Sequence, residues 1–318
     1  MSAWTPAWDV SPMSTTCGNY SDFTVSIVSY NSRDVLGECL KSLPEGIQVR
    51  VFDNASSDGS VAFLRDQFPD VKVIASAVNM GFGRGHNANL DRITTPFALI
   101  LNPDCFLNQQ AISEMASIVR NHPKVALVGP GAEGTVSASS ERYRDYGPGI
   151  VNPHHVEQLS GHCVMVRISA FADSGFFDPN LFLFYEDTDL CMKARLLGHV
   201  LVLAPQTEVR HLIGQSTPKS WKTTLRRDYH LGWSEAYYRC KYRQHQTRAF
   251  ELFRVAFKHA RKGLVRLLRL SPKTIESACR IYGVLAYSAS GLLPADVAVP
   301  TESETSQRDD RGPKQAAA

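Results

Sequence analysis

The stretch FALILNPD, residues 97–104, is a wholly apolar run that ends abruptly in Asn102-Pro103-Asp104. A short continuous apolar run bounded by turn residues is typical of a strand buried on both faces of a parallel sheet. Further strand patterns lie upstream at 23–29, 48–52 and 71–74, and helical patterns separate them at 33–43, 60–67 and 87–93. This alternation predicts an α/β domain with a mostly parallel central sheet covered by helices on both faces.

Polar residues gather where these expected strands end. In a parallel sheet, ligands bind beyond the carboxyl ends of the strands. The turn DNASSDGS (53–60) can accept hydrogen bonds from a nucleobase and a ribose, but it also reads as an ordinary turn that caps the helix beginning at Ser60. Asp104 can bind a divalent cation that also holds a diphosphate, or it can be a plain turn aspartate.

Two further candidates lie downstream. Tyr185-Glu186-Asp187-Thr188-Asp189 concentrates carboxylates before a helix expected at 190–197. One carboxylate could act as a general base, since crowded carboxylates raise one another's pKa, or all could simply favour the helix dipole. His211 could lie beside a bound cation or be structural.

Several classes of protein are excluded or disfavoured. NMGFGRGHN (79–87) lacks the spacing of a dinucleotide fingerprint, although its glycines allow close backbone approach to a nucleotide. The chain has no P-loop, GxSxG or HExxH pattern. Its seven cysteines include no CxxC pair, which disfavours a zinc cage or a disulfide framework. We see no signal peptide and no apolar run long enough to span a membrane, so we expect a cytoplasmic protein.

The charge is unevenly distributed along the chain. Residues 219–273 hold 15 Lys and Arg against 3 Asp and Glu, although the whole chain carries only +3. Helices are expected there at 222–243, 247–269 and 273–290. Phe250, Phe253, Phe257, Leu264 and Leu267 recur among the basic residues at roughly helical spacing. This segment either contacts an anionic membrane peripherally or packs on the catalytic domain with a solvated basic face; no nucleic-acid module accompanies it.

Seven segments in order resemble the family 2 inverting glycosyltransferases, which have the GT-A fold. The resemblance runs from about 23 to 216 and is closest to bacterial rhamnosyltransferases. It rests on VSIVSYN (25–31), VFDNASSDGS (51–60), NMGFGRGHN (79–87), LNPD (101–104), SGHCVMVR (160–167), FFDPNLFLFYEDTDLCMKARLLG (176–198) and RHLIGQS (210–216).

The resemblance implies roles for individual residues. Asp187 matches the catalytic base, with Glu186 beside the acceptor or metal. Asp104 matches the aspartate that binds Mg²⁺ or Mn²⁺, and His211 matches a histidine that completes this metal site in some members. Asn102 and Asp104 match positions near the donor diphosphate. Residues matching the nucleotide-binding positions are Tyr30, Asn31, Asp53, Asn54, Asp58, Gly81 and Asn87. The chain departs from the family in one respect, because Asn102 replaces the first aspartate of the usual Asp-x-Asp.

The resemblance implies the transfer of one sugar, with rhamnose as the candidate, from a nucleoside-diphosphate sugar to a hydroxyl of a glycan or lipid-linked acceptor, in surface polysaccharide or glycoconjugate synthesis. No QxxRW motif of processive synthases is present. The 131–155 stretch could close over the donor. Two alternatives stay open: a nucleotide-sugar-binding scaffold without turnover, and a nucleotidyltransferase. We expect a flexible arm at 1–22, the GT-A domain at 23–217, a basic helical extension at 218–295 and a disordered tail at 296–318.

Overall fold

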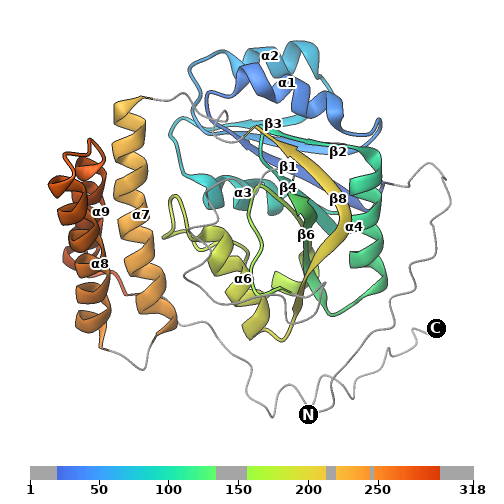
Figure 1. Cartoon of the computed structure of the whole chain (residues 1–318). Helices are drawn as coiled ribbons and strands as arrows, with labels where there is room; N and C mark the ends of the chain where they lie inside the picture. Colours follow the sequence, from blue (N-terminus) through green and yellow to red (C-terminus); the bar gives the residue numbers. More distant parts are fainter. Residues whose placement is uncertain (1–19, 134–155, 213–219, 244–246, 294–318) are drawn as a thin grey trace.

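The computed structural model describes residues 20–133, 156–212, 220–243 and 247–293. It contains an α/β part built on a central sheet, and three C-terminal helices beside it (Figure 1). The strands are β1 (Phe23–Ser29), β2 (Gln48–Asp53), β3 (Lys72–Ala75), β4 (Phe97–Leu101), β5 (Cys105–Leu107), β6 (Val125–Glu133), β7 (Cys163–Arg167) and β8 (Val200–His211). The helices are α1 (Arg33–Ser42), α2 (Ser60–Gln67), α3 (Phe82–Leu90), α4 (Gln109–Asn121), α6 (Glu186–Leu196), α7 (Trp221–Tyr242), α8 (Arg248–Leu268) and α9 (Thr274–Ala289), with a 3₁₀ turn at Ile168–Phe171.

The described strands form one sheet in the order β3-β2-β1-β4-β7-β6-β8-β5. Strands β1 to β4 pair in parallel, as the alternating pattern predicted. The second half is mixed: β6 and β8 are parallel, whereas β7 is antiparallel to β4 and β6, and β5 is antiparallel to β8. Because β1 to β4 run the same way, Asp53 and the residues after Leu101 lie at one edge of the sheet.

Helices cover the sheet on both faces, as expected. Apolar residues of α1, α2 and α4 pack with inward side chains of β1 and β4 in the larger core cluster. Residues of α3 and α6 pack in a second cluster against alternate residues of β4 and β7. Every side chain of β4 is buried, because each face of this strand meets a helix layer.

The predicted helix at 87–93 was wrong at its start, because α3 begins at Phe82 inside the Gly-rich turn. Glycine is a poor helix former, but this helix packs very closely against its neighbours. A Cβ added at Gly83 would come within 2.9 Å of the Phe177 side chain. Tertiary packing therefore outweighs local propensity here.

The predicted helix at 190–197 was also wrong at its start, because α6 begins at Glu186. Its first turn contains Glu186, Asp187 and Asp189, where the positive end of the helix dipole favours carboxylates. The acidic cluster therefore belongs to the helix itself and projects from its N-terminal end.

The C-terminal helices form a layer beside the α/β part, with α7 between that part and the pair α8 and α9 (Figure 1). They begin and end within one residue of the predicted ranges. Gly232 on α7 and Gly283 on α9 allow a close crossing, since a Cβ on either would overlap the backbone of the other helix. Within the described residues, no helix is long and apolar enough to cross a bilayer.

The segment boundaries can be compared with the structure only in part. Tyr20, within the predicted arm, is buried against the core, and its ring makes an edge contact with Phe23. The described part of the predicted 131–155 loop, residues 131–133, belongs to β6, and the rest lies outside the described residues. The predicted tail at 296–318 lies outside them as well. The six described cysteines are free thiols.

Candidate functional site

Asp53 ends β2 and is almost fully buried. Its Oδ1 accepts a hydrogen bond from the Ser56 N–H at 2.9 Å. Its Oδ2 is buried, and no donor of the described residues reaches it. A buried carboxylate oxygen without a partner is costly in free energy, so an N–H group of a ligand would fit this position.

The ends of β1 and β2 are joined through Asn31 and the turn after Asp53. Asn31 has a left-handed backbone, with φ 52°. Its N–H donates to Ser56 Oγ at 2.9 Å, and its Oδ1 accepts from the Ser57 N–H at 2.7 Å. Half-buried Tyr30 precedes it at the same edge of the sheet. Nucleotide contacts of Tyr30 and Asn31 stay predictions.

Asp58 joins the same turn to the beginning of α1. Its carboxylate accepts the N–H groups of Arg33 at 2.9 Å and Ser60 at 3.0 Å, and also the Ser60 hydroxyl. Burial acts to raise the pKa of Asp58, but these hydrogen bonds outweigh it and hold the pKa below its usual value. Asp58 therefore shapes the turn, and its contact with a nucleotide stays a prediction.

The Gly-rich turn is tied to its surroundings by two of the candidate residues. Asn54 Nδ2 donates to the Gly81 carbonyl at 3.0 Å, and Asn54 Oδ1 accepts from the Met80 N–H at 2.6 Å. The amide group of Asn87 makes two hydrogen bonds with the backbone of Phe177, at 2.8 and 3.0 Å. Both side chains hold the segments that surround the site, and their contacts with a nucleotide stay predictions.

We expect Gly81→Ala to lower the free energy of unfolding by about 3 kcal/mol. Gly81 has φ +87°, where an L-residue is strained by about 1–2 kcal/mol. A Cβ there would also overlap the carbonyl oxygen of Phe182, and overpacking of this kind costs about 1–3 kcal/mol. Urea denaturation measures the change. Gly175→Ala is the matched control, since Gly175 has φ +68° but nothing within 4 Å of the added carbon. Equal losses in both variants would contradict the role of the Phe182 contact.

Asp104 and His211 meet because β5 pairs with the end of β8. Cys105 lies opposite His211 in this antiparallel pair, and the Leu212 N–H donates to the Asp104 carbonyl at 2.9 Å. His211 Nε2 lies 3.3 Å from Asp104 Oδ1. Asp104 is fully buried, whereas the His211 side chain is 20% exposed. The structure therefore brings together two candidates that are far apart in the sequence.

This pair fits a divalent cation. Asp104, Cys105 and His211 each offer one ligand atom, and the three atoms lie within 4.8 Å of one another. Carboxylate oxygen suits Mg²⁺ and Mn²⁺, imidazole nitrogen suits transition-metal ions, and sulfur suits softer ions. The carboxylate and imidazole together fit Mn²⁺ better than Mg²⁺, and the Cys105 thiol adds little for either. Asn102 is half-buried just before them, and its N–H donates to the His162 carbonyl at 2.8 Å.

His162 is a site residue to which the sequence analysis assigned no role. Its ring stacks on that of His211, with centroids 4.8 Å apart and an interplanar angle of 11°. Burial, helped by the nearby His211, lowers the pKa of His162 to about 4, so this ring is neutral near pH 7. The signal in the sequence was the Ser-Gly-His turn before an apolar strand, which the motif at 160–167 contained.

Asp187 lies half-buried in the first turn of α6. Its Oδ2 accepts the Gly161 N–H at 3.1 Å, and its Oδ1 accepts the Thr188 N–H at 2.7 Å. Gly161 and His162 are consecutive, so one turn of the chain contacts both Asp187 and His211. Glu186 is buried beside Asp187. Three motifs that are separate in the sequence therefore adjoin around residues 160–162.

The chain enters α6 through two strained residues. Phe184 and Tyr185 both have left-handed backbones, with φ 69° and 67°. Such conformations cost about 1–3 kcal/mol each and persist where the surroundings impose them. Helix α7 supplies those surroundings: the Arg227 guanidinium lies 5.5 Å from the Phe184 ring centroid, and the Tyr238 ring lies 5.4 Å from that of Tyr185. Helix α7 thus supports the position of Asp187.

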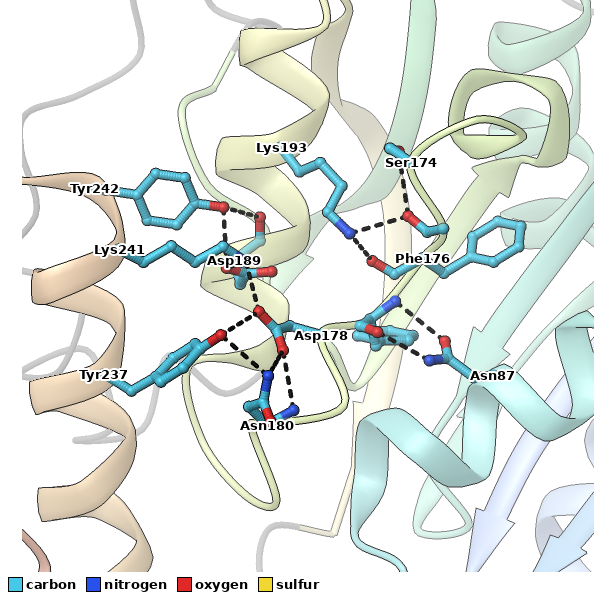
Figure 2. A network of polar contacts seen from close by, with 12 residues as sticks. Asn87, Ser174, Phe176, Asp178, Asn180, Asp189, Lys193, Tyr237, Lys241 and Tyr242 are labelled. Atoms are coloured by element: carbon cyan, nitrogen blue, oxygen red, sulfur yellow. Dashed lines mark hydrogen bonds and ion pairs between the residues drawn. The ribbon is translucent and has the colours of Figure 1, made fainter. Parts of the chain in front are cut away.

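A buried ionic network also joins α7 to α6, as Figure 2 shows. Lys241 Nζ lies 2.7 Å from Asp178 Oδ2 and 2.6 Å from Asp189 Oδ1. The Tyr242 hydroxyl donates to Asp189 at 2.9 Å, and the Tyr237 hydroxyl donates to Asp178 at 2.8 Å. This network was not predicted, because nothing in the sequence pairs a lysine near the end of α7 with these two distant aspartates.

The chain is similar in sequence to known glycosyltransferases. A family model described as Glycosyl transferase family group 2 matches residues 100–293, and one described as Glycosyl transferase family 2 matches residues 24–175. The N-acetylglucosaminyl-diphospho-decaprenol L-rhamnosyltransferase of Mycobacterium tuberculosis is 24% identical over 238 residues, which cover 60% of this chain and 78% of that protein. The low-salt glycan biosynthesis hexosyltransferase Agl10 of Haloferax volcanii is 25% identical over 197 residues, covering 55% of this chain and 62% of that protein.

A solved structure with the same fold is the mannosyltransferase PcManGT from Pyrobaculum calidifontis, determined in complex with GDP-Man and Mn²⁺. It superposes with a TM-score of 0.57 at 16% identity, over 90% of this chain and 92% of that chain. The expected GT-A fold is confirmed by this likeness.

Proposed function

Since this chain belongs to glycosyl transferase family group 2, we propose that it transfers one sugar unit from a nucleoside-diphosphate sugar to a hydroxyl group of a glycan or lipid-linked acceptor. The activity as a glycosyltransferase follows from the family. L-Rhamnose is the sugar that we propose first, because the M. tuberculosis relative is named as an L-rhamnosyltransferase acting on a diphospho-decaprenol. Its name also supports a lipid-linked acceptor and a role in surface polysaccharide or glycoconjugate synthesis.

One observation carries this proposal: the 160–162 turn contacts Asp187 on one side and the Asp104–His211 pair on the other. Glycosyl transfer needs a base at the acceptor hydroxyl and charge compensation at the departing diphosphate, close together. The turn provides this proximity, since its Gly161 N–H bonds Asp187 while its His162 ring stacks on His211.

At the diphosphate end, Asp104 and His211 would hold the cation. Bound there, Mn²⁺ or Mg²⁺ would supply Lewis-acid compensation for negative charge on the diphosphate. Asn102 lies beside this pair in place of a second aspartate, so the protein offers one carboxylate rather than two. The buried Oδ2 of Asp53 would accept an N–H of the nucleobase at the adjacent edge of the sheet.

At the acceptor end, Asp187 is the group that would take the proton. The two backbone N–H groups on its oxygens fix the orientation of the carboxylate. Proton removal makes the acceptor oxygen nucleophilic as it forms its bond to the anomeric carbon and the nucleoside diphosphate leaves from the opposite face. A single displacement of this kind inverts the anomeric configuration.

A thermal-shift panel of nucleoside-diphosphate sugars with Mn²⁺ tests the proposal. A donor present at a hundred times its dissociation constant stabilises the folded state by about 2.7 kcal/mol, which raises the melting temperature by several degrees. We expect one nucleobase and sugar to stand out, and nucleoside-diphosphate rhamnoses are the first to try. If no nucleotide sugar raised the melting temperature with or without metal, the proposal would fail.

We expect His211→Ala to raise the Mn²⁺ concentration for half-maximal stabilisation by at least about tenfold, because one nitrogen ligand is lost. The same thermal-shift titration, with the selected donor present, measures this. His199→Ala is the control, since His199 directly precedes β8 and lies at the opposite end of that strand from His211. An unchanged Mn²⁺ titration in His211→Ala would remove His211 from the proposed metal site.

A further inference from the structure

Helix α8 has its apolar stripe on the outside. A surface helix ordinarily turns such a stripe to the core. Here the exposed fractions of five apolar side chains run from 47% at Phe250 to 76% at Leu268. We call these five the outer face of α8: Phe250, Phe253, Phe257, Leu264 and Leu268. Their spacing places them on one side of the helix.

The inner face of α8 combines polar and apolar side chains, because Leu252, Val255 and Ala256 belong to or pack against a hydrophobic cluster with α7 and α9. Its buried residues are Glu251, Val255 and His259. His259 Nε2 lies 3.0 Å from Glu235 Oε2 on α7, and Lys258 Nζ lies 3.2 Å from Glu235 Oε1. Ionic contacts with α7 therefore help to hold α8 in place, and its folding does not require the outer face.

The charges around the outer face have one sign. Residues 248–289 contain nine Lys and Arg but only two acidic residues, Glu251 and Glu276. Glu251 is buried, and Glu276 lies 3.5 Å from Arg266. The exposed cations are Arg254, Arg261, Lys262, Arg269 and Lys273. An aromatic and aliphatic stripe bordered by cations is the pattern of a helix that lies in the interface of an anionic bilayer.

We propose that the outer face of α8 docks this enzyme on an anionic lipid bilayer. The apolar side chains enter the boundary between headgroups and acyl chains, while Arg261, Lys262 and Arg269 contact the lipid phosphates. The turn after α8 adds Leu270, which is 90% exposed. This inference concerns the C-terminal helices only and holds whichever sugar the enzyme transfers.

A second copy of the chain is a poorer occupant of this face. In a two-fold dimer the same patch meets itself, so the cations that border the outer face would face one another. An anionic bilayer provides an apolar layer for the side chains of the outer face and negative charge for the cations that border it. Charge complementarity therefore favours the bilayer.

Co-sedimentation of the full chain with vesicles tests the inference. We expect binding to vesicles of equal parts phosphatidylcholine and phosphatidylglycerol, little binding to phosphatidylcholine alone, and release by salt. Phe253→Ser/Phe257→Ser/Leu264→Ser should weaken binding at least about 100-fold, because each side chain loses its apolar burial. Arg261→Gln/Lys262→Gln/Arg269→Gln should weaken it by about fivefold per cation, or about 100-fold in total.

Matched controls separate docking from general charge. Arg65→Gln/Lys72→Gln/Lys124→Gln removes three exposed cations from the α/β part and should leave vesicle binding unchanged. Circular dichroism should show that all variants are folded, since every substituted side chain is exposed. Equal binding to both kinds of vesicle, or unchanged binding by the serine variant, would overturn the inference. So would a lack of vesicle binding together with a concentration-dependent dimer that the serine variant loses.

Discussion

Asp187→Asn is expected to lower kcat by about a thousandfold, because an amide cannot take the proton of the acceptor hydroxyl and general-base catalysis contributes about 10²–10⁴ in rate. The substitution keeps the shape of the side chain, and its remaining oxygen can still accept one of the two N–H groups of Gly161 and Thr188. Donor binding should therefore persist. Release of nucleoside diphosphate in the presence of acceptor measures kcat, and the thermal shift measures donor binding.

Asp91→Asn is the control for this experiment, since Asp91 is an exposed carboxylate at the end of α3. It should turn over like the unmodified enzyme. Full activity in Asp187→Asn would remove Asp187 from the role of base. Loss of activity together with loss of the donor-induced thermal shift would instead point to damage to the donor site.

Lys241→Met is expected to lower the free energy of unfolding by about 4 kcal/mol at neutral pH. The substitution leaves Asp178 and Asp189 buried near each other without their shared cation, and breaking a buried ion pair costs about 3–5 kcal/mol. Because Lys241 joins α7 to the helix that carries Asp187, the loss should also loosen that helix. Urea denaturation measures the stability.

The loss of stability caused by Lys241→Met should be smaller at acidic pH than at neutral pH. Burial acts to raise the pKa of Asp178, but its contacts with Lys241 outweigh burial and lower the pKa. A carboxylate with a lowered pKa contributes stability above its unfolded pKa, and that contribution is lost as the pH falls through the folded value. For Asp189, burial outweighs the contact with Lys241 and raises the pKa. Protonation removes the negative charges that Lys241 balances, so the difference between the unmodified enzyme and Lys241→Met should shrink as the pH falls from neutral into the acidic range.

Lys262→Met is the matched control, because Lys262 is exposed on α8 and should change the stability by less than about 0.5 kcal/mol. A Lys241→Met variant as stable as the unmodified enzyme would contradict the prediction. So would a penalty of the same size at acidic pH, since it would show that the two carboxylates are not the cause.

The α/β architecture was predictable because its early elements carry strong local patterns. The strand at 97–101 and the helix at 60–67 were predicted with their observed boundaries. Strand β5 was missed, because three residues form no recognisable period and this strand exists through its pairing with β8. The starts of α3 and α6 were misplaced because glycine and aspartate, poor helix formers in isolation, are accommodated there by close packing and by the helix dipole.

The candidate site was predictable as a set of residues but not as an arrangement. Asp104, Asp187 and His211 were candidates because each follows a strand or begins a helix within a family motif. That His211 contacts Asp104, and that the 160–162 turn joins both to Asp187, depends on pairings between distant segments. Gly161 and His162 were overlooked, although the motif at 160–167 contained both, because the contact of Gly161 with Asp187 and the stacking of His162 on His211 join segments that are distant in the sequence.

The sequence by itself determined the family, the alternating elements and the presence of an apolar stripe among cations on α8, because these depend on the order and spacing of residues. Tertiary structure alone decided which residues meet. It placed Lys241 between Asp178 and Asp189, and it turned Glu251 and His259 rather than the phenylalanines of α8 towards α7. The physical reason is that a periodic pattern defines two faces of a helix, but only the partners available across the interface decide which face is buried.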